Sequence, residues 1–314
     1  MRFRANIDNV PTFFRIMQTL EKLQKRLIIK FTETTMHLIC NSDTNEGGIQ
    51  VWSQIKVPSL FSKYRIQSNA NNEITLVLSS EALLGALRSA SSNPSGLTIN
   101  PNNGNANGQG NNVNSIETEE VIVRLTKKNE QAMLSFEITG LSRLGRTVRV
   151  AHDVRIEVLK PLDAARLGEP LCPAPDVHVL LPPLQKLRTI VERLRPMSNI
   201  LALRANNSGV LQIAVNTEGV KVETEWRGCT NPKTSEEEEN ADGDEDEGEK
   251  DPEKLHSVVI SIKSFLKFLN SHVVSTTTIA CICQHHCLIL YVYIGDVADA
   301  GGVLTFYIPA VIDE

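Results

Sequence analysis

Long hydrophobic runs are missing from this sequence of 314 residues. The longest apolar run, Cys287 to Ile294, falls far short of the roughly 18 residues that a transmembrane helix requires. Arg2 and Arg4 interrupt the opening residues, where a secretory signal would need an apolar core. Without membrane span or secretory route, the six cysteines are expected to be reduced thiols in the cytosol or nucleus.

Motifs that would carry catalysis are also absent. The sequence contains no phosphate-binding Gly-Lys loop, no His-Glu-x-x-His and no Gly-x-Ser-x-Gly. We therefore predict that the protein is not an enzyme and uses no cofactor.

One group of residues has the composition of a zinc site. It contains Cys281, Cys283, His285, His286 and Cys287. The first two cysteines alternate along an expected strand and the histidines fall in its hairpin turn, so the ligands would diverge. Buried strand cysteines are the favoured interpretation, and no metal site is predicted. A metal-dependent enzyme with a site near Cys281 to Cys287 stays open as an alternative function.

The negative net charge is concentrated in one segment. The chain carries a formal charge of -5, but twelve Asp or Glu and one Lys between Ser235 and Glu253 give that segment alone -11. The remainder therefore carries +6. A mildly basic body of this kind suits a polyanionic partner.

Two segments have the composition of disordered loops. Residues 100–114 consist almost entirely of Asn, Gly, Pro, Ala and Gln, and residues 233–253 form the acidic segment. Neither has enough apolar side chains to offset the conformational entropy that the segment would lose on becoming ordered.

Outside these loops, helix-like stretches with one apolar face recur, each followed by several strand-like runs. The stretches are Pro11 to Arg26, Ser80 to Ala90, Pro183 to Arg195 and Ser261 to His272. A repeated unit that cannot bury its own apolar face packs against its copies. The pattern predicts an α+β protein of two similar domains, each with two strand-helix-strands units, antiparallel sheets and helices on one side.

A segment rich in proline separates the two predicted domains. Residues 160–175 contain four prolines and Gly168, too many breakers for a helix or a central strand. We predict a first domain over 1–159, a connector over 160–175 and a second domain over 176–314.

The polar backs of the four stretches carry lysine and arginine. These candidate DNA-binding residues are Arg15, Lys22, Lys25 and Arg26 on the first, Arg88 on the second, Lys186, Arg188, Arg193 and Arg195 on the third, and Lys263 and Lys267 on the fourth. On the third stretch, Arg188 and Arg195 lie along one flank, and Lys186 and Arg193 along the other. On a single helix such cations would simply favour solubility. Repeated over four helices on one face, they would form a basic surface that suits phosphate contacts. Aromatic residues make up only 5% of the chain and do not alternate with the cations, which favours duplex over single-stranded DNA.

Several segments, taken in order, resemble a known family. They are Met1 to Ala5, Pro175 to Pro182, Leu187 to Arg193, Met197 to Asn199 and Phe306 to Ala310. The chain resembles the PCNA-like DNA sliding clamps, and more narrowly the Hus subunits of the nine-one-one DNA-damage checkpoint clamp. The resemblance spans nearly the whole chain except the two predicted loops.

The resemblance implies a non-catalytic subunit that joins two related subunits in a heterotrimeric ring around double-stranded DNA. Sheets would form the outside of the ring and the four helices its inner lining. An ATP-driven clamp loader would open the ring in the nucleus, and checkpoint and DNA repair proteins would bind near the connector at 160–176. Family lining positions are matched by Arg15, Lys22, Lys25, Arg88, Arg188, Arg193, Arg195 and Lys263, whereas Gln185 stands where some members have a basic residue. A homotrimeric replication clamp is the nearest alternative.

Overall fold

The structure, a computed structural model, describes residues 1–41, 48–91, 116–142, 145–232, 251–275, 277–295 and 300–311. Contacts between Cα atoms divide the chain into two compact units. The first unit is Met1–Glu21, Lys25–Met36 and Lys56–Ala164, and the second unit is Lys22–Gln24, His37–Ile55 and Ala165–Glu314. The predicted loop at 100–114 and most of that at 233–253 lie outside the described residues.

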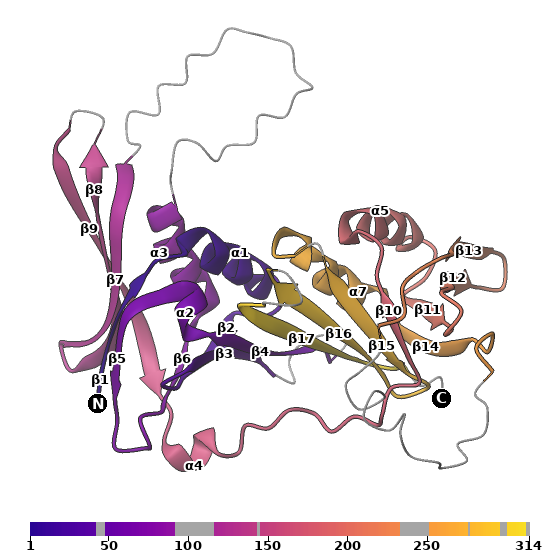
Figure 1. Ribbon diagram of the computed structural model, residues 1–314, viewed down its shortest axis with the longest axis horizontal. Helices are drawn as coiled ribbons and strands as arrows, with labels where there is room; N and C mark the ends of the chain where they lie inside the picture. Colours follow the sequence, from indigo (N-terminus) through magenta and orange to yellow (C-terminus); the bar gives the residue numbers. More distant parts are fainter. Residues whose placement is uncertain are drawn as a thin grey trace, which may run out of the picture. The chain divides into compact units, whose positions relative to one another are not determined.

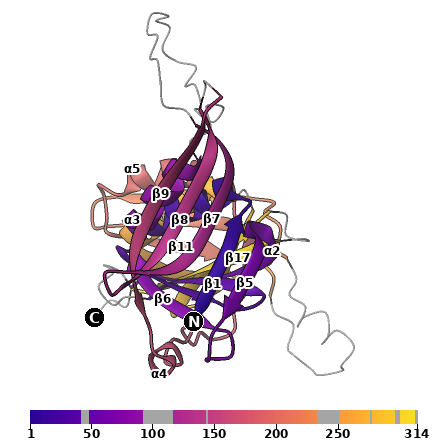
Figure 2. The same cartoon turned by 90° about the vertical axis from the view of Figure 1, so that its left-hand side faces the viewer.

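The first unit is built on an antiparallel sheet in the order β2-β6-β9-β8-β7-β1-β5 (Figures 1 and 2). Its elements are β1 (Arg2–Ile7), α1 (Val10–Glu21), β2 (Arg26–Phe31), α2 (Val57–Leu60), β5 (Phe61–Gln67), β6 (Ile74–Ser79), α3 (Ser80–Ser91), β7 (Ile116–Lys128), β8 (Gln131–Ser142), β9 (Thr147–Val158) and α4 (Pro161–Ala164). Strand β1 buries Phe3 and Ala5 and exposes Arg2 and Arg4, the alternation expected of a half-buried strand.

Helices α1 and α3 pack against each other through the apolar faces that the sequence predicts. Met17 and Leu20 of α1 and Leu83 and Leu87 of α3 are completely buried. The side chain of Asn9 accepts a hydrogen bond from the backbone N–H of Thr12 at 3.2 Å, which caps the start of α1.

The predicted end of the first helix is wrong. Helix α1 ends at Glu21, and β2 begins at Arg26. The carbonyl of Lys25 instead accepts hydrogen bonds from the backbone N–H of Ser80 at 2.9 Å and from its hydroxyl at 3.2 Å. Lys22 and Lys25 therefore lie in the loop after α1, and Arg26 lies on a strand.

The second unit contains two antiparallel sheets, β10-β15-β16-β17-β4-β3 and β13-β12-β11-β14 (Figure 1). Its elements are β3 (Thr35–Cys40, of which 37–40 belong to this unit), β4 (Gln50–Lys56), β10 (Val177–Leu180), α5 (Leu184–Leu194), β11 (Ile200–Ala205), β12 (Leu211–Asn216), β13 (Lys221–Trp226), β14 (His256–Ser261), α7 (Ile262–Leu269), the 3-10 helix η2 (Asn270–Val273), β15 (Thr278–Cys283), β16 (Cys287–Ile294) and β17 (Gly302–Pro309).

Aromatic side chains anchor α7 in the core of the second unit. Phe265 and Phe268 stack with ring centroids 5.6 Å apart, and Phe268 meets Phe306 of β17 edge to face at 5.2 Å. Leu187 and Val191 of α5 are completely buried, and α5 contacts α7. The predicted fourth helix is correct to Leu269, after which the chain continues as η2, and the Asn270 side chain donates to two carbonyls in the last turn of α7.

Strand β17 pairs with β4, which comes from the first half of the sequence. The pairing runs from Gly302 opposite Ile55 to Tyr307 opposite Gln50. A Cβ atom at Gly302 would lie 2.7 Å from the carbonyl oxygen of Gln54, so the approach of the two backbones requires glycine. This pairing explains why residues 37–55 belong to the second unit. The domain boundaries predicted from the sequence follow chain order and stay a prediction.

Short elements were missed in the sequence. Strand β5 and the one-turn helix α2 were not predicted, and the one-turn helix α4 lies inside the connector, where no helix was expected. Pro161 opens α4, a position where proline costs no hydrogen bond because the first backbone N–H groups of a helix have no intrahelical partner.

Candidate nucleic-acid interface

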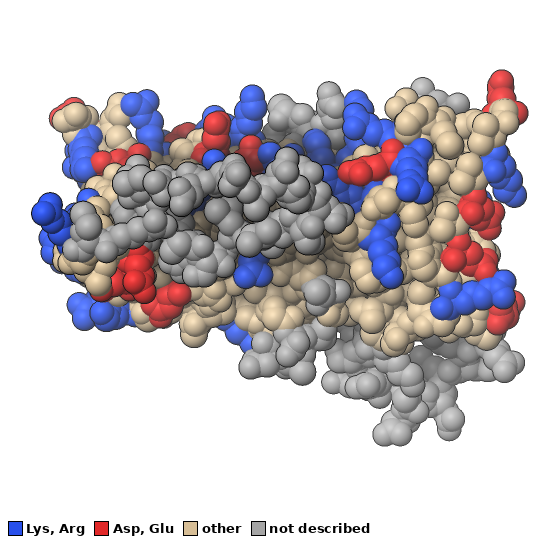
Figure 3. Space-filling model, turned by 90° about the horizontal axis from the view of Figure 1, so that it is seen from above, with Lys and Arg blue, Asp and Glu red and all other residues tan. Residues whose placement is uncertain are grey.

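A cavity of about 440 Å³ lies between α5 and α7 in the second unit. It is lined by the cations Arg188, Arg195, Lys263 and Lys267 together with Glu192, Leu266 and Asn270. In Figure 3, the surface that carries α5 and α7, on the right, shows Lys and Arg side chains with acidic ones among them. The sequence placed these cations on separate helices, and the packing of α5 against α7 brings them to one cavity.

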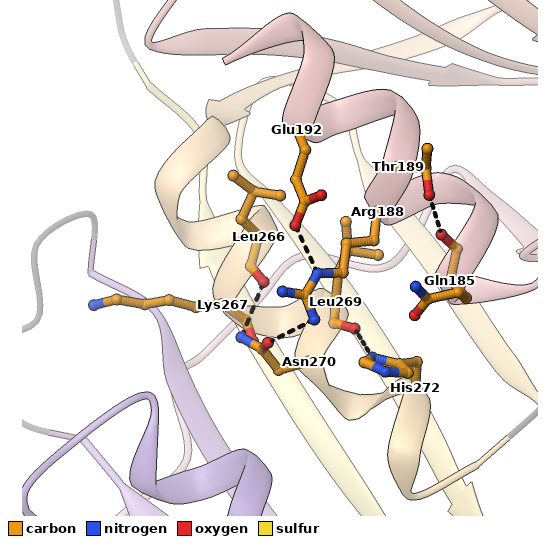
Figure 4. Close-up of polar contacts among 9 residues, drawn as sticks. All are labelled: Gln185, Arg188, Thr189, Glu192, Leu266, Lys267, Leu269, Asn270 and His272. Carbon is orange, nitrogen blue, oxygen red and sulfur yellow. Dashed lines mark hydrogen bonds and ion pairs between the residues drawn. The ribbon is translucent and has the colours of Figure 1, made fainter. Parts of the chain in front are cut away.

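Arg188 is held in place by two contacts (Figure 4). Its Nε donates a hydrogen bond to Oε1 of Glu192 at 2.8 Å, and its Nη1 donates to Oδ1 of Asn270 at 3.2 Å. The guanidinium has five N–H groups, so these two contacts leave further donors for an anionic ligand. A guanidinium already held in this way loses less side-chain entropy when it binds a phosphate.

Asn270 joins this contact to the end of α7. Its Nδ2 donates to the carbonyl oxygens of Leu266 at 3.2 Å and Lys267 at 3.1 Å, so its oxygen is left to accept from Arg188. Figure 4 shows Asn270 facing Arg188, whereas Lys267 extends away from both. The last turn of α7 thus fixes the orientation of a cation on α5.

The predicted cations of the third and fourth stretches differ in how far their side chains are exposed. Lys186, Arg193 and Arg195 are exposed, as is Lys263, whereas Arg188 and Lys267 are half-buried. The cavity is lined by Arg188 and Arg195 and not by Lys186 or Arg193. This division matches the two flanks that helical periodicity predicts for this segment.

The predicted cations of the first two stretches lie on several kinds of element. Arg15 is exposed on α1, and Arg88 is exposed in the last turn of α3. Lys22 and Lys25 are exposed in the loop after α1. Arg26 forms an ion pair with Glu157 at 3.0 Å, so its charge is already partly neutralised.

Two polar residues of the cavity were missed in the sequence. Glu192 lies one helical turn after Arg188, and this spacing could have indicated the ion pair. Asn270 gave no such signal, because its contact with Arg188 joins residues 82 positions apart and depends on the packing of α5 against α7.

The cysteines considered as metal ligands form an apolar cluster. Cys281, Cys283 and Cys287 are buried together with Ile289, and Cys172 packs against them. Burial raises the pKa of Cys281 to about 12, which favours the neutral thiol over the thiolate that binds metals. Within the described ranges, no group of three or more His, Cys, Asp or Glu could hold a metal ion.

In the same part of the chain, no helix is long and apolar enough to cross a membrane.

Known proteins resemble this chain over its full length. A family model described as "Hus1-like protein" matches residues 1–312. The chain is 32% identical over 314 residues to "Checkpoint protein hus1" of Schizosaccharomyces pombe, covering 100% of both proteins. It is 27% identical over 316 residues to "Checkpoint protein HUS1" of Homo sapiens, covering 99% of both.

Among solved structures, the fold matches that of the Proliferating Cellular Nuclear Antigen from Entamoeba histolytica. The TM-score is 0.66 at 12% sequence identity, covering 99% of both chains. At this identity the likeness concerns the fold alone. The α+β clamp fold predicted from the sequence is confirmed.

Proposed function

Because the chain belongs to the Hus1-like family, we propose that it is one of three different subunits of a checkpoint sliding clamp that encircles duplex DNA. Within this proposal, the helical faces of α1, α3, α5 and α7 contact the DNA backbone. The observation that carries the DNA contact is the convergence of four cations on the cavity between α5 and α7. Cations of this kind neutralise phosphates without reading bases, so binding is independent of sequence and sensitive to salt.

The strand order supports assembly into a ring. The two halves of the chain repeat the same order of elements. The third strand after the first long helix is β4 in the first half and β13 in the second half. The third strand after the second long helix is β9 in the first half and β17 in the second half. Strand β4 pairs with β17 within the chain. Strand β13 stands at the end of its sheet, and residues 147–155 of β9 pair only with β8 among the described strands.

We infer that β13 of one subunit pairs with the strand equivalent to β9 in the next subunit, as β4 pairs with β17. No side chain of β13 is buried, and neither is any from Thr147 to Asp153 of β9. An unpaired strand edge is a ready template for pairing with another chain. A head-to-tail contact that repeats with a fixed rotation closes a ring.

The connector suits the role of a binding platform. Leu171 is fully exposed and Leu162 is 78% exposed, so apolar side chains are presented to solvent in this segment. In our proposal, checkpoint signalling and DNA repair proteins bind near residues 160–176, and an ATP-driven loader opens the ring in the nucleus. The chain itself supplies no catalytic step in this scheme.

Charge reversal on the helices tests the DNA contact. The lining variant replaces Arg15, Arg195 and Lys263 by Glu, taking one exposed cation from α1, one from the end of α5 and one from α7. We expect its affinity for a fluorescein-labelled DNA duplex to fall at least about tenfold in fluorescence anisotropy at low salt. The slope of log K against log salt should become shallower by about 0.9 for each lost phosphate contact.

The matched control reverses three exposed cations on strands. Arg2 and Arg4 lie on the exposed face of β1, and Arg65 lies opposite Arg4 on β5. Their replacement by Glu changes the net charge by the same amount as the lining variant. If both variants lose affinity equally, or neither does, the helical faces do not bind DNA and the proposal fails.

A further inference from the structure

One carboxylate stands among the cations of the cavity between α5 and α7. Of the described residues that line it, Glu192 is the acidic one, and its Oε1 accepts the hydrogen bond from Nε of Arg188 at 2.8 Å. A carboxylate in this position occupies a donor of Arg188 that a phosphate would otherwise use. It also adds a negative charge to a site whose other charges are positive.

The two partners of Arg188 differ in how firmly they are held. Asn270 is fixed by hydrogen bonds to two carbonyls at the end of α7. The side chain of Glu192 is 52% exposed, and that of Arg188 is 33% exposed. Solvent screens an ion pair of this kind, and another anion can replace the carboxylate at small cost. Asn270 is neutral and keeps its contact with Arg188 when the carboxylate leaves.

We propose that Glu192 is a resident counter-anion that a DNA backbone phosphate replaces on Arg188, and that it thereby limits the affinity of the clamp for DNA. This inference rests on the proposed function, because it assigns the ligand of the same helical face. The displaced carboxylate stays one helical turn from Arg188 and repels the bound phosphate. The contact is therefore weak and readily exchanged, as a ring that moves along DNA requires.

The substitution Glu192→Gln tests this inference in the full chain. It removes the charge and keeps the shape of the side chain. We expect the affinity for a fluorescein-labelled DNA duplex at low salt to rise about two- to fivefold, the effect of removing one screened charge interaction. The slope of log K against log salt should steepen by up to about 0.9, the value for one more neutralised phosphate. Glu192→Asp, which keeps the charge, should bind like the unmodified chain.

A second ion pair provides a matched control. Glu73 lies 2.9 Å from Lys30, with exposed fractions of 45% and 31% that are close to those of Glu192 and Arg188. Glu73→Gln removes the same charge at a residue that does not line the cavity, and it should leave the affinity unchanged. If Glu73→Gln and Glu192→Gln tighten binding equally, net charge explains the effect and the inference is wrong.

The dependence on Arg188 separates displacement from a purely structural role. In an Arg188→Ala background, Glu192→Gln should no longer tighten binding. An equal gain with and without Arg188, or weaker binding by Glu192→Gln alone, would overturn the inference. If the lining variant loses affinity but Glu192→Gln gains none, only this inference fails. If the lining variant binds like its control, or the unmodified chain binds no duplex, the proposed function fails as well.

Discussion

The carboxylate of Asp153 on β9 accepts hydrogen bonds from side chains on two other strands. Lys128 Nζ at the end of β7 and the hydroxyl of Ser135 on β8 each donate a hydrogen bond to it at 2.5 Å. These two hydrogen bonds, the one from Lys128 first, hold the pKa of Asp153 below its usual value. A carboxyl group with a lowered pKa stabilises the fold above its unfolded pKa of about 3.9, and this contribution is lost as the pH falls through the folded value.

We expect Asp153→Asn to lower the free energy of unfolding by about 1 kcal/mol at pH 7, since it weakens two charge-assisted hydrogen bonds on a partly exposed strand. The difference from the unmodified chain should shrink towards zero as the pH falls through the lowered pKa of Asp153 in the folded state, below which both proteins carry a neutral group. Urea unfolding followed by circular dichroism at several pH values measures it. Glu119→Gln, an exposed carboxylate on β7, is the control, and a difference that does not change with pH would contradict the prediction.

The amino-acid sequence alone indicated some residues of the candidate interface and gave no indication of others. The cations Arg188 and Lys263 could be chosen from the sequence because charge opposite an apolar stripe marks an exposed helix face. Their neighbour Asn270 could not be chosen, since a polar residue at the end of a helix is common and its contact with Arg188 exists only after α5 and α7 have packed.

At the scale of whole elements, the apolar period predicted the buried faces of the helices better than their ends. The stripe of α1 is buried as expected, and that of α5 is buried except for Ile190, which is half-buried. The predicted end of α1 was wrong: the helix ends at Glu21, and the carbonyl of Lys25 accepts a hydrogen bond from a residue distant in the sequence, Ser80. Strand β5 was missed because its apolar signal is weak. Phe61 is its one fully buried residue, and the other side chains alternate between half-buried and exposed, so pairing with β1 supports its strand conformation.

The pairing of β17 with β4 leads to a prediction about one glycine. A Cβ atom at Gly302 would lie 2.7 Å from the carbonyl oxygen of Gln54 and 2.8 Å from Cα of Ile55. We expect Gly302→Ala to lower the free energy of unfolding by about 1 to 3 kcal/mol, because the two backbones must separate. Thermal unfolding followed by circular dichroism provides the measurement.

The control for this prediction is a glycine with open space around it. Gly85 lies within α3, and a Cβ atom at this position would have no neighbouring atom within 4 Å outside its own helix backbone. Gly85→Ala should raise the free energy of unfolding by up to about 1 kcal/mol, since alanine is the better helix former. Equal stability of Gly302→Ala and the unmodified chain would show that β4 and β17 do not approach as closely as described.

At the scale of the whole molecule, the family and the fold support a clamp subunit, and the proposed heterotrimer adds a requirement for two different partners. A chain that needs different partners should not form a trimer with itself. Light scattering of the purified chain, of mass 34.7 kDa, distinguishes a chain that does not assemble with itself from a homotrimer. A self-assembled trimer would favour the homotrimeric replication clamp.

The strand edges proposed for ring closure lead to a prediction about backbone protection. In a strand at the edge of a sheet, the N–H groups that point away from its neighbour exchange readily with solvent. Assembly with the two other subunits should slow hydrogen exchange in β13 and in residues 147–155 of β9. Strand β5, which also stands at the edge of its sheet, should keep its exchange rates because the proposed ring leaves it unpaired.

Hydrogen–deuterium exchange with mass spectrometry compares the chain alone with the assembled complex. Slower exchange in β13 and β9 together, with β5 unchanged, is the pattern that head-to-tail pairing requires, since each subunit contributes one strand to each of its two contacts. Protection of β5 instead would place the contact between subunits at the end of the sheet that β5 forms in the first unit. Unchanged exchange in all three strands would mean that the subunits associate through other surfaces, and the internal pairing of β4 with β17 would then not be the pattern for the ring.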